Sequence, residues 1–179
     1  MKTVLCFVAL CVALTASRTP TETYPRTVVI DPNFSMFWKF NNTHITIEMH
    51  LTMGGWAGLG LTKDPSGAMF PGDVMIGYVL NNKGVIADYH TVGHSPPIKD
   101  ASQDITLLYA HSDHAGSVLK FVRPLDTGDS QDDITILPGA NHVIFAYTES
   151  DPANLAYHKT NRGSADIALL DINEPPVGK

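Results

Sequence analysis

The sequence predicts an all-β sandwich, and three observations lead to that prediction. Turn-forming residues recur about every 8 to 12 positions, a spacing typical of many short strands. Residues 43–51 alternate apolar and polar side chains, the period of two that gives a strand one buried and one solvated face. An apolar period of 3.6 residues never persists beyond about two turns, so the pattern does not favour helices.

About ten strands are expected along the chain. Residues 35–40 and 43–51 form the first clear pair of alternating segments. The other expected strands are apolar segments between turns, at 56–61, 74–80, 85–89, 105–109, 118–122, 134–137, 143–147 and 167–170. The turn Asn82-Lys83-Gly84 is typical of a hairpin, because Asn and Gly tolerate positive φ.

The first 17 residues have the composition of a secretory signal peptide. Lys2 supplies the positive start, an uncharged apolar run follows, and the run ends in small residues that suit signal peptidase. That run is too short to cross a membrane, which takes about 20 apolar residues. We therefore expect a secreted, extracellular protein without membrane insertion.

The remaining chain reads as one domain with short tails. Residues 18–27 hold two prolines and predict an extended tail. Residues 28–172 are the expected domain, and residues 173–179 are an expected flexible tail. About 160 residues are enough to bury a self-sufficient core.

Composition excludes several classes of function. The chain has 179 residues and two cysteines, Cys6 and Cys11, both in the expected leader. Disulfide-stapled miniproteins, zinc ribbons, iron–sulfur proteins and thiol enzymes all need cysteines in the mature chain. The net charge is −6 and no basic run is present, so nucleic acid and anionic membranes are not expected partners.

Two residues stand in unusual settings. Met69 lies in a loop rich in glycine and proline, and His158 lies in a polar turn. Methionine usually fills gaps in a core, and a turn histidine is usually solvated. A thioether and an imidazole in loops can also ligate a soft metal or a haem iron. Both readings remain open from the residues alone.

Other histidines occur in closely spaced pairs. His90 and His94 lie four residues apart, and His111 and His114 lie three apart. Imidazoles at such spacing can hold copper or zinc, but neither pair brings an obvious third ligand. We expect these side chains to be exposed at hairpin tips.

The acidic loop is expected to be solvated. It holds Asp126, Asp129, Asp132 and Asp133 without the spacing of an EF-hand calcium loop. Serine-nucleophile, phosphate-loop and His-Glu-x-x-His motifs are also absent from the sequence. No catalytic residue is predicted.

Two sequons fit a secreted chain. Asn33 begins the triplet Asn-Phe-Ser, and Asn41 begins the triplet Asn-Asn-Thr. They predict glycosylation at Asn33 and Asn41.

Several short motifs follow one another along the chain. They are Trp56-Ala57-Gly58-Leu59-Gly60, Met69, Gly72-Asp73-Val74, Ile76-Gly77, Asp88-Tyr89-His90, Asp100-Ala101-Ser102-Gln103-Asp104, Phe121-Val122-Arg123-Pro124-Leu125, Tyr157-His158 and Asn161-Arg162-Gly163-Ser164. In this order they resemble a DOMON domain, most closely the amino-terminal DOMON domain of dopamine β-monooxygenase-like copper monooxygenases. The resemblance covers about residues 28–170 and implies an immunoglobulin-like β-sandwich.

The resemblance implies a domain without oxygenase chemistry of its own. In that family the chemistry belongs to downstream copper domains with His-His and His-x-His ligands, which this sequence does not contain. The relatives also tend to carry a cysteine where Gly128 stands here, resembling a tether to the catalytic part. We therefore expect a stand-alone domain that hydroxylates nothing by itself.

The resemblance also implies a cofactor. DOMON domains of the cellobiose-dehydrogenase-like kind bind haem b through a loop methionine and a late histidine. By motif position these are Met69 and His158, with Trp56, Phe70 and Tyr157 expected beside the porphyrin. A His/Met pair fills both axial positions and favours electron transfer to a redox partner protein over oxygen activation. Asp73 is expected to be only a turn or strand-start residue.

Two alternatives remain. The domain could be a non-redox module that binds a small molecule, such as a saccharide or catecholamine-like ligand, in the sandwich pocket. It could also be a fragment of a longer monooxygenase gene.

Overall fold

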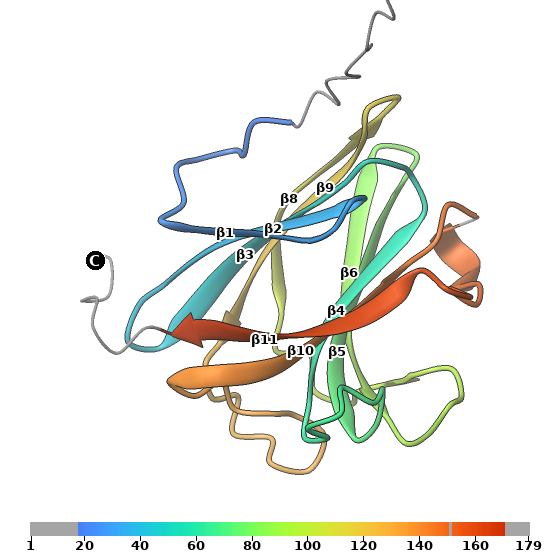
Figure 1. The fold of residues 1–179 in the computed structure, drawn as a ribbon. Helices are drawn as coiled ribbons and strands as arrows, with labels where there is room; N and C mark the ends of the chain where they lie inside the picture. The colour runs from blue at the N-terminus through green and yellow to red at the C-terminus, as the bar shows by residue number, and fades with distance from the viewer. Residues whose placement is uncertain (1–17, 151, 171–179) are drawn as a thin grey trace, which may run out of the picture.

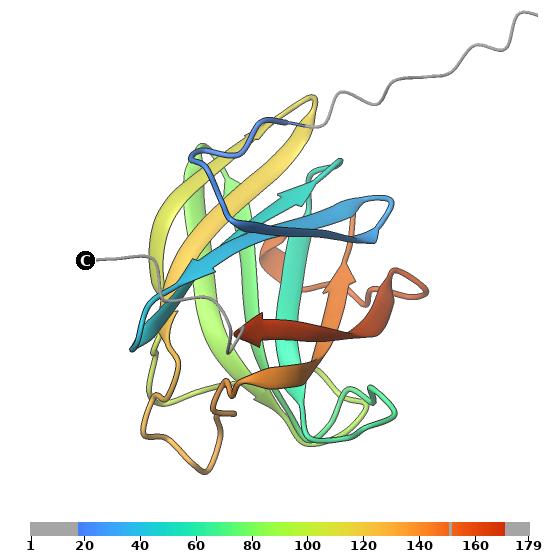
Figure 2. The ribbon, with the colours of Figure 1, turned by 60° about the vertical axis from the view of Figure 1, so that its left-hand side comes forward.

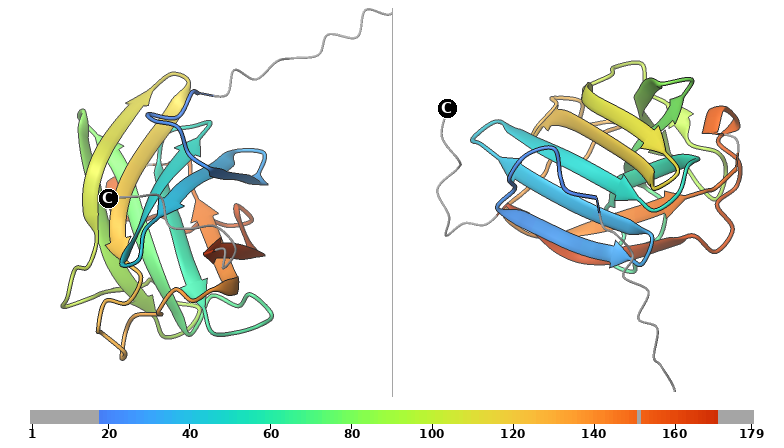
Figure 3. Two further views of the ribbon diagram at one scale, coloured as in Figure 1. Left: turned by 90° about the vertical axis from the view of Figure 1, so that its left-hand side faces the viewer. Right: turned by 90° about the horizontal axis from the view of Figure 1, so that it is seen from above.

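The computed structural model describes residues 18–150 and 152–170, whose regular secondary structure is β-strand apart from one short 3-10 turn (Figure 1). Two antiparallel sheets lie face to face, as the turned views show (Figures 2 and 3). The prediction of an all-β sandwich is therefore confirmed. The signal peptide and flexible tail predicted for residues 1–17 and 173–179 lie outside the described residues.

The first sheet has the strand order β1-β2-β3-β9-β8. Its strands are β1 (Arg26–Asp31), β2 (Phe34–Phe40), β3 (His44–Leu51), β9 (Gly116–Pro124) and β8 (Thr106–Asp113). β3 pairs with β2 on one side and with β9 on the other, which places β3 at the centre of this sheet.

The second sheet has the order β11-β10-β4-β5-β6-β7. Its strands are β11 (Arg162–Leu170), β10 (Gly139–Tyr147), β4 (Trp56–Thr62), β5 (Gly72–Leu80), β6 (Lys83–Thr91) and β7 (Ile98–Lys99). A short 3-10 turn, η1 (Pro152–Asn154), precedes β11. No helix in the described part of the chain is long and apolar enough to cross a membrane.

The strand prediction fails at residues 134–137, which form no strand. Ile136 is nevertheless buried, and its N–H donates to the Leu125 carbonyl over 2.8 Å. The apolar pattern there reflects a loop that packs into the core rather than a ladder. The strands β1 and β7 were not predicted, because β1 begins inside the expected tail and β7 has only two residues.

The β5–β6 hairpin is confirmed, but its turn lies one residue earlier than expected. Asn81 and Asn82 have φ of 50° and 60°, and Leu80 pairs with Lys83 across them. Gly84 lies in β6, where an added Cβ would stand 2.2 Å from the Ala110 Cβ of β8. The glycine is therefore needed for the close approach of two strands.

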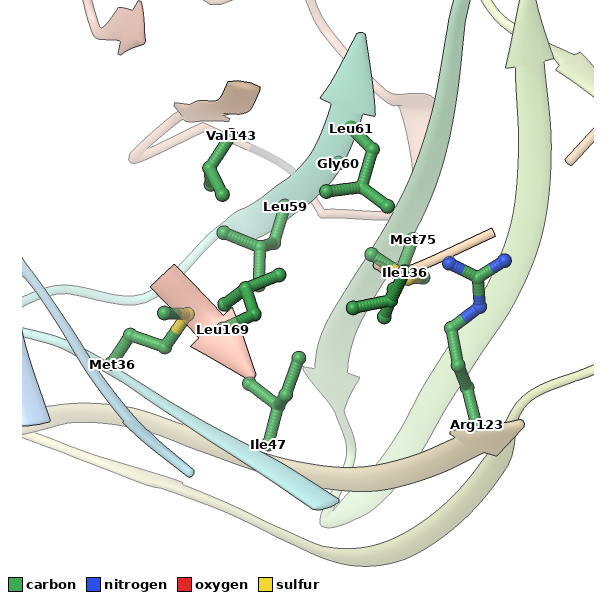
Figure 4. A pocket seen from close by; sticks show the side chains of 10 residues that line it. All are labelled: Met36, Ile47, Leu59, Gly60, Leu61, Met75, Arg123, Ile136, Val143 and Leu169. Atoms are coloured by element: carbon green, nitrogen blue, oxygen red, sulfur yellow. The ribbon is translucent and has the colours of Figure 1, made fainter. Parts of the chain in front are cut away.

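The core fills the space between the sheets. On β3, Ile45, Ile47 and Met49 are almost fully buried, as the period of two predicts. A cavity between the sheets has a volume of about 10 Å³, room for about one water molecule, and is lined by apolar residues together with Arg123 (Figure 4). The small-molecule alternative stays a prediction.

The second face of β3 is buried too, contrary to the expected solvated face. Glu48 is fully buried, and its carboxylate accepts hydrogen bonds from the Thr21 N–H at 2.9 Å and the Tyr24 hydroxyl at 2.9 Å. His50 Nε2 lies 2.6 Å from Glu48 Oε1. Because the expected N-terminal tail lies across this face and its polar groups reach Glu48, the segment is part of the fold.

A buried ion pair joins the two sheets. Arg123 on β9 and Asp73 on β5 are both fully buried, and Arg123 Nη2 lies 2.8 Å from Asp73 Oδ2. The same oxygen accepts the Ile134 N–H over 2.9 Å, which fixes the loop after β9. Burial raises the pKa of Asp73 to about 6 while the Arg123 charge opposes that rise. Asp73 starts a strand, as predicted, but its main role is this contact.

Replacing Arg123 is expected to be strongly destabilising. Arg123→Met leaves the Asp73 carboxylate buried without its partner, and breaking a buried pair in this way costs about 3–5 kcal/mol. Urea unfolding at neutral pH measures the effect. Lys99→Met, on the exposed strand β7, is the control and should change the free energy of unfolding by less than about 0.5 kcal/mol. Equal stability of the two variants would contradict the assigned role.

Glu48→Gln should weaken the fold in a pH-dependent way. Burial raises the pKa of Glu48, but hydrogen bonds from His50, Thr21 and Tyr24 outweigh it and lower the pKa to about 2. A lowered carboxyl pKa stabilises the fold above its ordinary value of 4.5, and this stabilisation is lost as the pH falls toward about 2. The stability advantage of the parent over Glu48→Gln should therefore shrink over that interval in urea unfolding series. Glu149→Gln, at an exposed position, should show no such trend, and an advantage that grows on acidification would refute the assignment.

Candidate functional site

The outer face of the six-stranded sheet carries an apolar cluster separate from the core. Residues 57, 59 and 61 of β4 point into the core, so Trp56, Gly58 and Gly60 belong to the outer face. Trp56 is buried there, and the cluster is completed by Val74, Ile76 and Ile144 with partly buried Tyr78, Tyr89, Ala146 and Leu155. An apolar surface outside the sandwich core needs a cover, and two loops supply it.

The loop before β11 covers one end of this cluster and positions His158. Trp56 Nε1 donates to the Ala156 carbonyl over 3.1 Å, and the His158 ring meets the Trp56 ring edge to face at 6.3 Å between centroids. The Asn161 N–H closes the turn on the His158 carbonyl at 2.9 Å. Trp56 and His158 are therefore neighbours, and the position of Trp56 beside a porphyrin stays a prediction.

The electrostatic setting of His158 suits a metal ligand. Burial lowers the pKa of His158, so the imidazole is neutral at neutral pH. Its Nδ1 lies 3.3 Å from the Lys159 carbonyl oxygen. An Nδ1–H directed at that carbonyl leaves the Nε2 lone pair free, which is the arrangement that orients ligating histidines.

The loop 63–71 covers the other end and carries Met69. The Thr91 hydroxyl donates to the Met69 carbonyl over 2.6 Å, and a Cβ added at Gly72 would lie 2.6 Å from the same oxygen. A Cβ added at Gly67 would lie 2.1 Å from Ser164 Oγ, so the loop also reaches β11. Met69 is half-buried against the start of β5.

The two expected ligands lie on loops that reach the six-stranded sheet at different places, His158 beside Trp56 of β4 and Met69 beside Gly72 of β5. The Met69 carbonyl lies beside Gly72, at the start of β5. The Trp56 ring, which contacts His158, lies beside Gly58, and Gly58 pairs with Ile76 of β5. Gly72 and Ile76 are four positions apart, which is about 13 Å along the strand. The two loops therefore reach this sheet at different points, and no contact between the Met69 and His158 side chains is found in the described part of the chain.

The other expected neighbours are largely solvent-exposed. Tyr157 is 68% exposed and stacks on His158 with 4.9 Å between ring centroids. Arg162 donates to the Tyr157 hydroxyl over 3.0 Å. Phe70 is 41% exposed and faces His94. Both aromatic side chains stand at the rim of the covered surface rather than within it.

The sequence missed a cluster of buried charges at one end of the sandwich. Asp88 and Asp133 are buried near the Arg123–Asp73 pair, and Arg123 Nη2 lies 3.7 Å from Asp133 Oδ2. The expectation of a wholly solvated acidic loop is therefore wrong at Asp133. The signal that could have revealed the cluster is charge in otherwise apolar strands, at Asp73, Asp88 and Arg123.

The two sequons differ in the structure. The Asn33 side chain is engaged: its Nδ2 donates to the Tyr147 hydroxyl over 3.1 Å and its Oδ1 accepts the Thr52 hydroxyl over 2.7 Å. Asn41 is exposed, and its Oδ1 accepts the Thr43 N–H over 2.9 Å. Glycosylation stays a prediction at both, and Asn41 is the more accessible acceptor.

Comparison with known proteins places these features in context. A family model described as the DOMON domain matches residues 30–148. The chain is 31% identical over 167 residues to DBH-like monooxygenase protein 1 of Mus musculus, covering 91% of this chain and 27% of that protein. It thus spans about a quarter of the length of the curated relatives it matches.

Two solved structures share the fold. The cytochrome domain of Myriococcum thermophilum cellobiose dehydrogenase superimposes with a TM-score of 0.62 at 15% identity, covering 78% of this chain and 80% of that one. The cytochrome b domain of pyranose dehydrogenase from Coprinopsis cinerea gives a TM-score of 0.57 at 17% identity, covering 82% and 88%. At these identities the likeness shows a common fold.

The outer face of β4 should tolerate an added methyl group at Gly58 but not at Gly60. A Cβ at Gly58 would meet its nearest atom at 3.4 Å, an ordinary contact, whereas a Cβ at Gly60 would lie 2.5 Å from the Asp73 carbonyl oxygen. Gly58→Ala should therefore leave the free energy of unfolding within about 1 kcal/mol of the parent, and Gly60→Ala should lower it by about 1–3 kcal/mol through overpacking. Urea unfolding measures both values, and an equal loss of stability in Gly58→Ala and Gly60→Ala would contradict this packing.

Proposed function

Because this chain belongs to the DOMON family, we propose that it is a secreted module that binds haem b and exchanges single electrons with a partner protein. The setting of His158 carries the proposal: a neutral, half-buried imidazole lies against Trp56 with Nδ1 directed at a carbonyl. The common fold with two domains named as cytochromes supports it.

The donor atoms and apolar residues at this site fit haem chemically. His158 Nε2 and Met69 Sδ would be the axial ligands, a donor pair that haem iron accepts. Gly58 and Gly60 lack side chains on the outer face, and Val74, Ile76 and Ile144 make the surroundings apolar. These cluster residues are buried, and Leu155 of the loop before β11 packs against them, so uptake requires that loop to move.

The chain's own residues define how the module would work. Bound haem would supply a one-electron iron couple. His158 and Met69 would hold the iron through an imidazole and a thioether, a pair that raises the reduction potential and favours electron transfer. Trp56 holds the His158 turn through its Nε1 contact with Ala156. Tyr157, exposed and fixed by Arg162, would form the edge that a partner protein approaches.

The composition of residues 1–17 supports secretion. Among the described residues, Arg18 pairs with Asp113, and Thr21 binds Glu48. A cleavage after Ser17 would remove the apolar leader and leave these contacts intact. The monooxygenase activity that the relatives' names state belongs to much longer proteins and is not proposed for this chain.

Haem uptake tests the proposal through matched variants. Titration of the purified protein with haemin should give a saturable absorption change at one equivalent. His158→Ala and Met69→Leu should each weaken binding at least tenfold or leave the iron with an open axial position, because each removes one ligand. The readout is the visible spectrum in the oxidised and dithionite-reduced states.

The controls are a histidine and a methionine outside this surface. His111→Ala removes an exposed β8 side chain, and Met53→Leu changes a residue packed on the other core cluster. Both should bind haemin like the parent. A parent protein that gives no spectral change, or four variants that all bind equally, would refute the proposal and favour a non-redox ligand.

A further inference from the structure

A second set of potential ligands meets at the end of the sandwich, outside the proposed haem surface. His90 comes from the end of β6, Asp100 follows β7, and Asp132 comes from the loop between β9 and β10. His90 Nδ1 is hydrogen-bonded to Asp100 Oδ1 and lies 3.6 Å from Asp132 Oδ1. One ligand atom from each of the three residues lies within 4.8 Å of the others.

Asp100 has a buried carboxylate oxygen without a partner in the described segments, which is independent support for a bound cation. Asp100 is only 6% exposed, and among the described residues its Oδ2 has no hydrogen-bond partner. A buried carboxylate oxygen without a partner destabilises the fold, and the cost is larger for a charged group. A cation beside His90 would satisfy it.

The main chain holds Asp100 in this position. Its N–H donates to the Asp88 carbonyl over 3.1 Å, and Gln103 Nε2 donates to the Asp88 and Asp100 carbonyls at 3.0 Å each. β7 pairs with β6 through His90 and Ile98, which places Asp100 beside the imidazole. The arrangement is therefore built by the fold rather than by mobile surface side chains.

Charge around the trio favours a cation. Asp73, Asp88 and Asp133 lie deeper in the same end of the sandwich, with Arg123 in contact with Asp73 and Asp133. Those three carboxylates are buried, and Arg123 already occupies their neighbourhood. In contrast, the His90 and Asp132 side chains are 20% and 25% exposed, which gives an ion a route of entry.

We propose that His90, Asp100 and Asp132 bind a divalent transition-metal ion such as Zn²⁺. Calcium takes six to eight oxygens, whereas one imidazole with two carboxylates suits Zn²⁺ and its first-row neighbours. Ligands at about 2.1 Å on a tetrahedral ion lie about 3.4 Å apart, close to the 3.6 Å between His90 Nδ1 and Asp132 Oδ1. The ion replaces the proton between His90 and Asp100, and solvent completes its coordination.

This site revises two expectations from the sequence. The His90/His94 pair was set aside for want of a third ligand, and the acidic loop was expected to be only solvated. The fold supplies Asp100 and Asp132 as partners of His90 and leaves His94 exposed beside Phe70.

Calorimetric titration of the haem-free full chain with Zn²⁺, together with the visible spectrum of added Co²⁺, tests the site. One equivalent should bind, with proton release and a Co²⁺ spectrum of nitrogen and oxygen ligands. His90→Ala and Asp132→Asn should each weaken Zn²⁺ binding at least tenfold. His158→Ala protein should bind Zn²⁺ like the parent, which separates this result from the haem proposal.

The controls distinguish neighbouring possibilities. His94→Ala should bind Zn²⁺ normally, and its loss of binding would instead indicate the His90/His94 pair. Asp133→Asn tests the deeper carboxylates: if it abolishes binding while His90→Ala does not, the ion sits there and the proposal is wrong. Equal affinity for Ca²⁺ and Zn²⁺, or no binding of Zn²⁺, would also overturn it.

Discussion

The buried ion pair between Arg123 and Asp73 is the constraint on which much of the structure depends. It joins β9 of one sheet to β5 of the other, and Asp73 also holds the loop after β9 through the Ile134 N–H. A buried pair of this kind gains little net stability, but losing either partner leaves a charge that the interior cannot solvate. The pair therefore fixes how the sheets and this loop meet at that end of the sandwich.

The two faces of the β5–β6 region carry different chemistry as a consequence of strand alternation. Residues 74, 76 and 78 of β5 face outward and support the apolar surface shared by the Met69 and His158 loops. Asp73 faces inward, and its register partner His90 lies beside Asp100 and Asp132. One hairpin thus separates an apolar surface suited to a planar cofactor from a polar corner suited to a small cation.

The sequence was informative where local periodicity determines the outcome and less so where distant segments meet. The alternating residues of β3 predicted its buried face, and the Asn-rich turn predicted the β5–β6 hairpin. The burial of Glu48 could not be read from β3 alone, because its cover comes from Thr21 and Tyr24 in a segment that resembled a tail. Residues 134–137 had the composition of a strand but pack as a loop.

The same distinction applies to the site residues. Motif position predicted Met69 and His158 as ligands, which stays a prediction, and the structure adds the Trp56 ring and the Lys159 carbonyl as neighbours of the imidazole. Sequence spacing suggested that Phe70 and Tyr157 would line the cofactor, but both lie at an exposed rim. The sequence could not predict the partners of His90, because Asp100 and Asp132 come from two separate loops that only the fold brings to it.

The central claim is that His158 and Met69 together ligate one haem iron across the covered apolar surface. Resonance Raman spectra of the haemin-reconstituted protein, in the ferric and ferrous states, test it most directly because they report the coordination and spin state of the iron. We predict six-coordinate, low-spin iron in both the ferric and the ferrous state. Five-coordinate, high-spin iron in the parent protein, or a spectrum unchanged by His158→Ala, would contradict it.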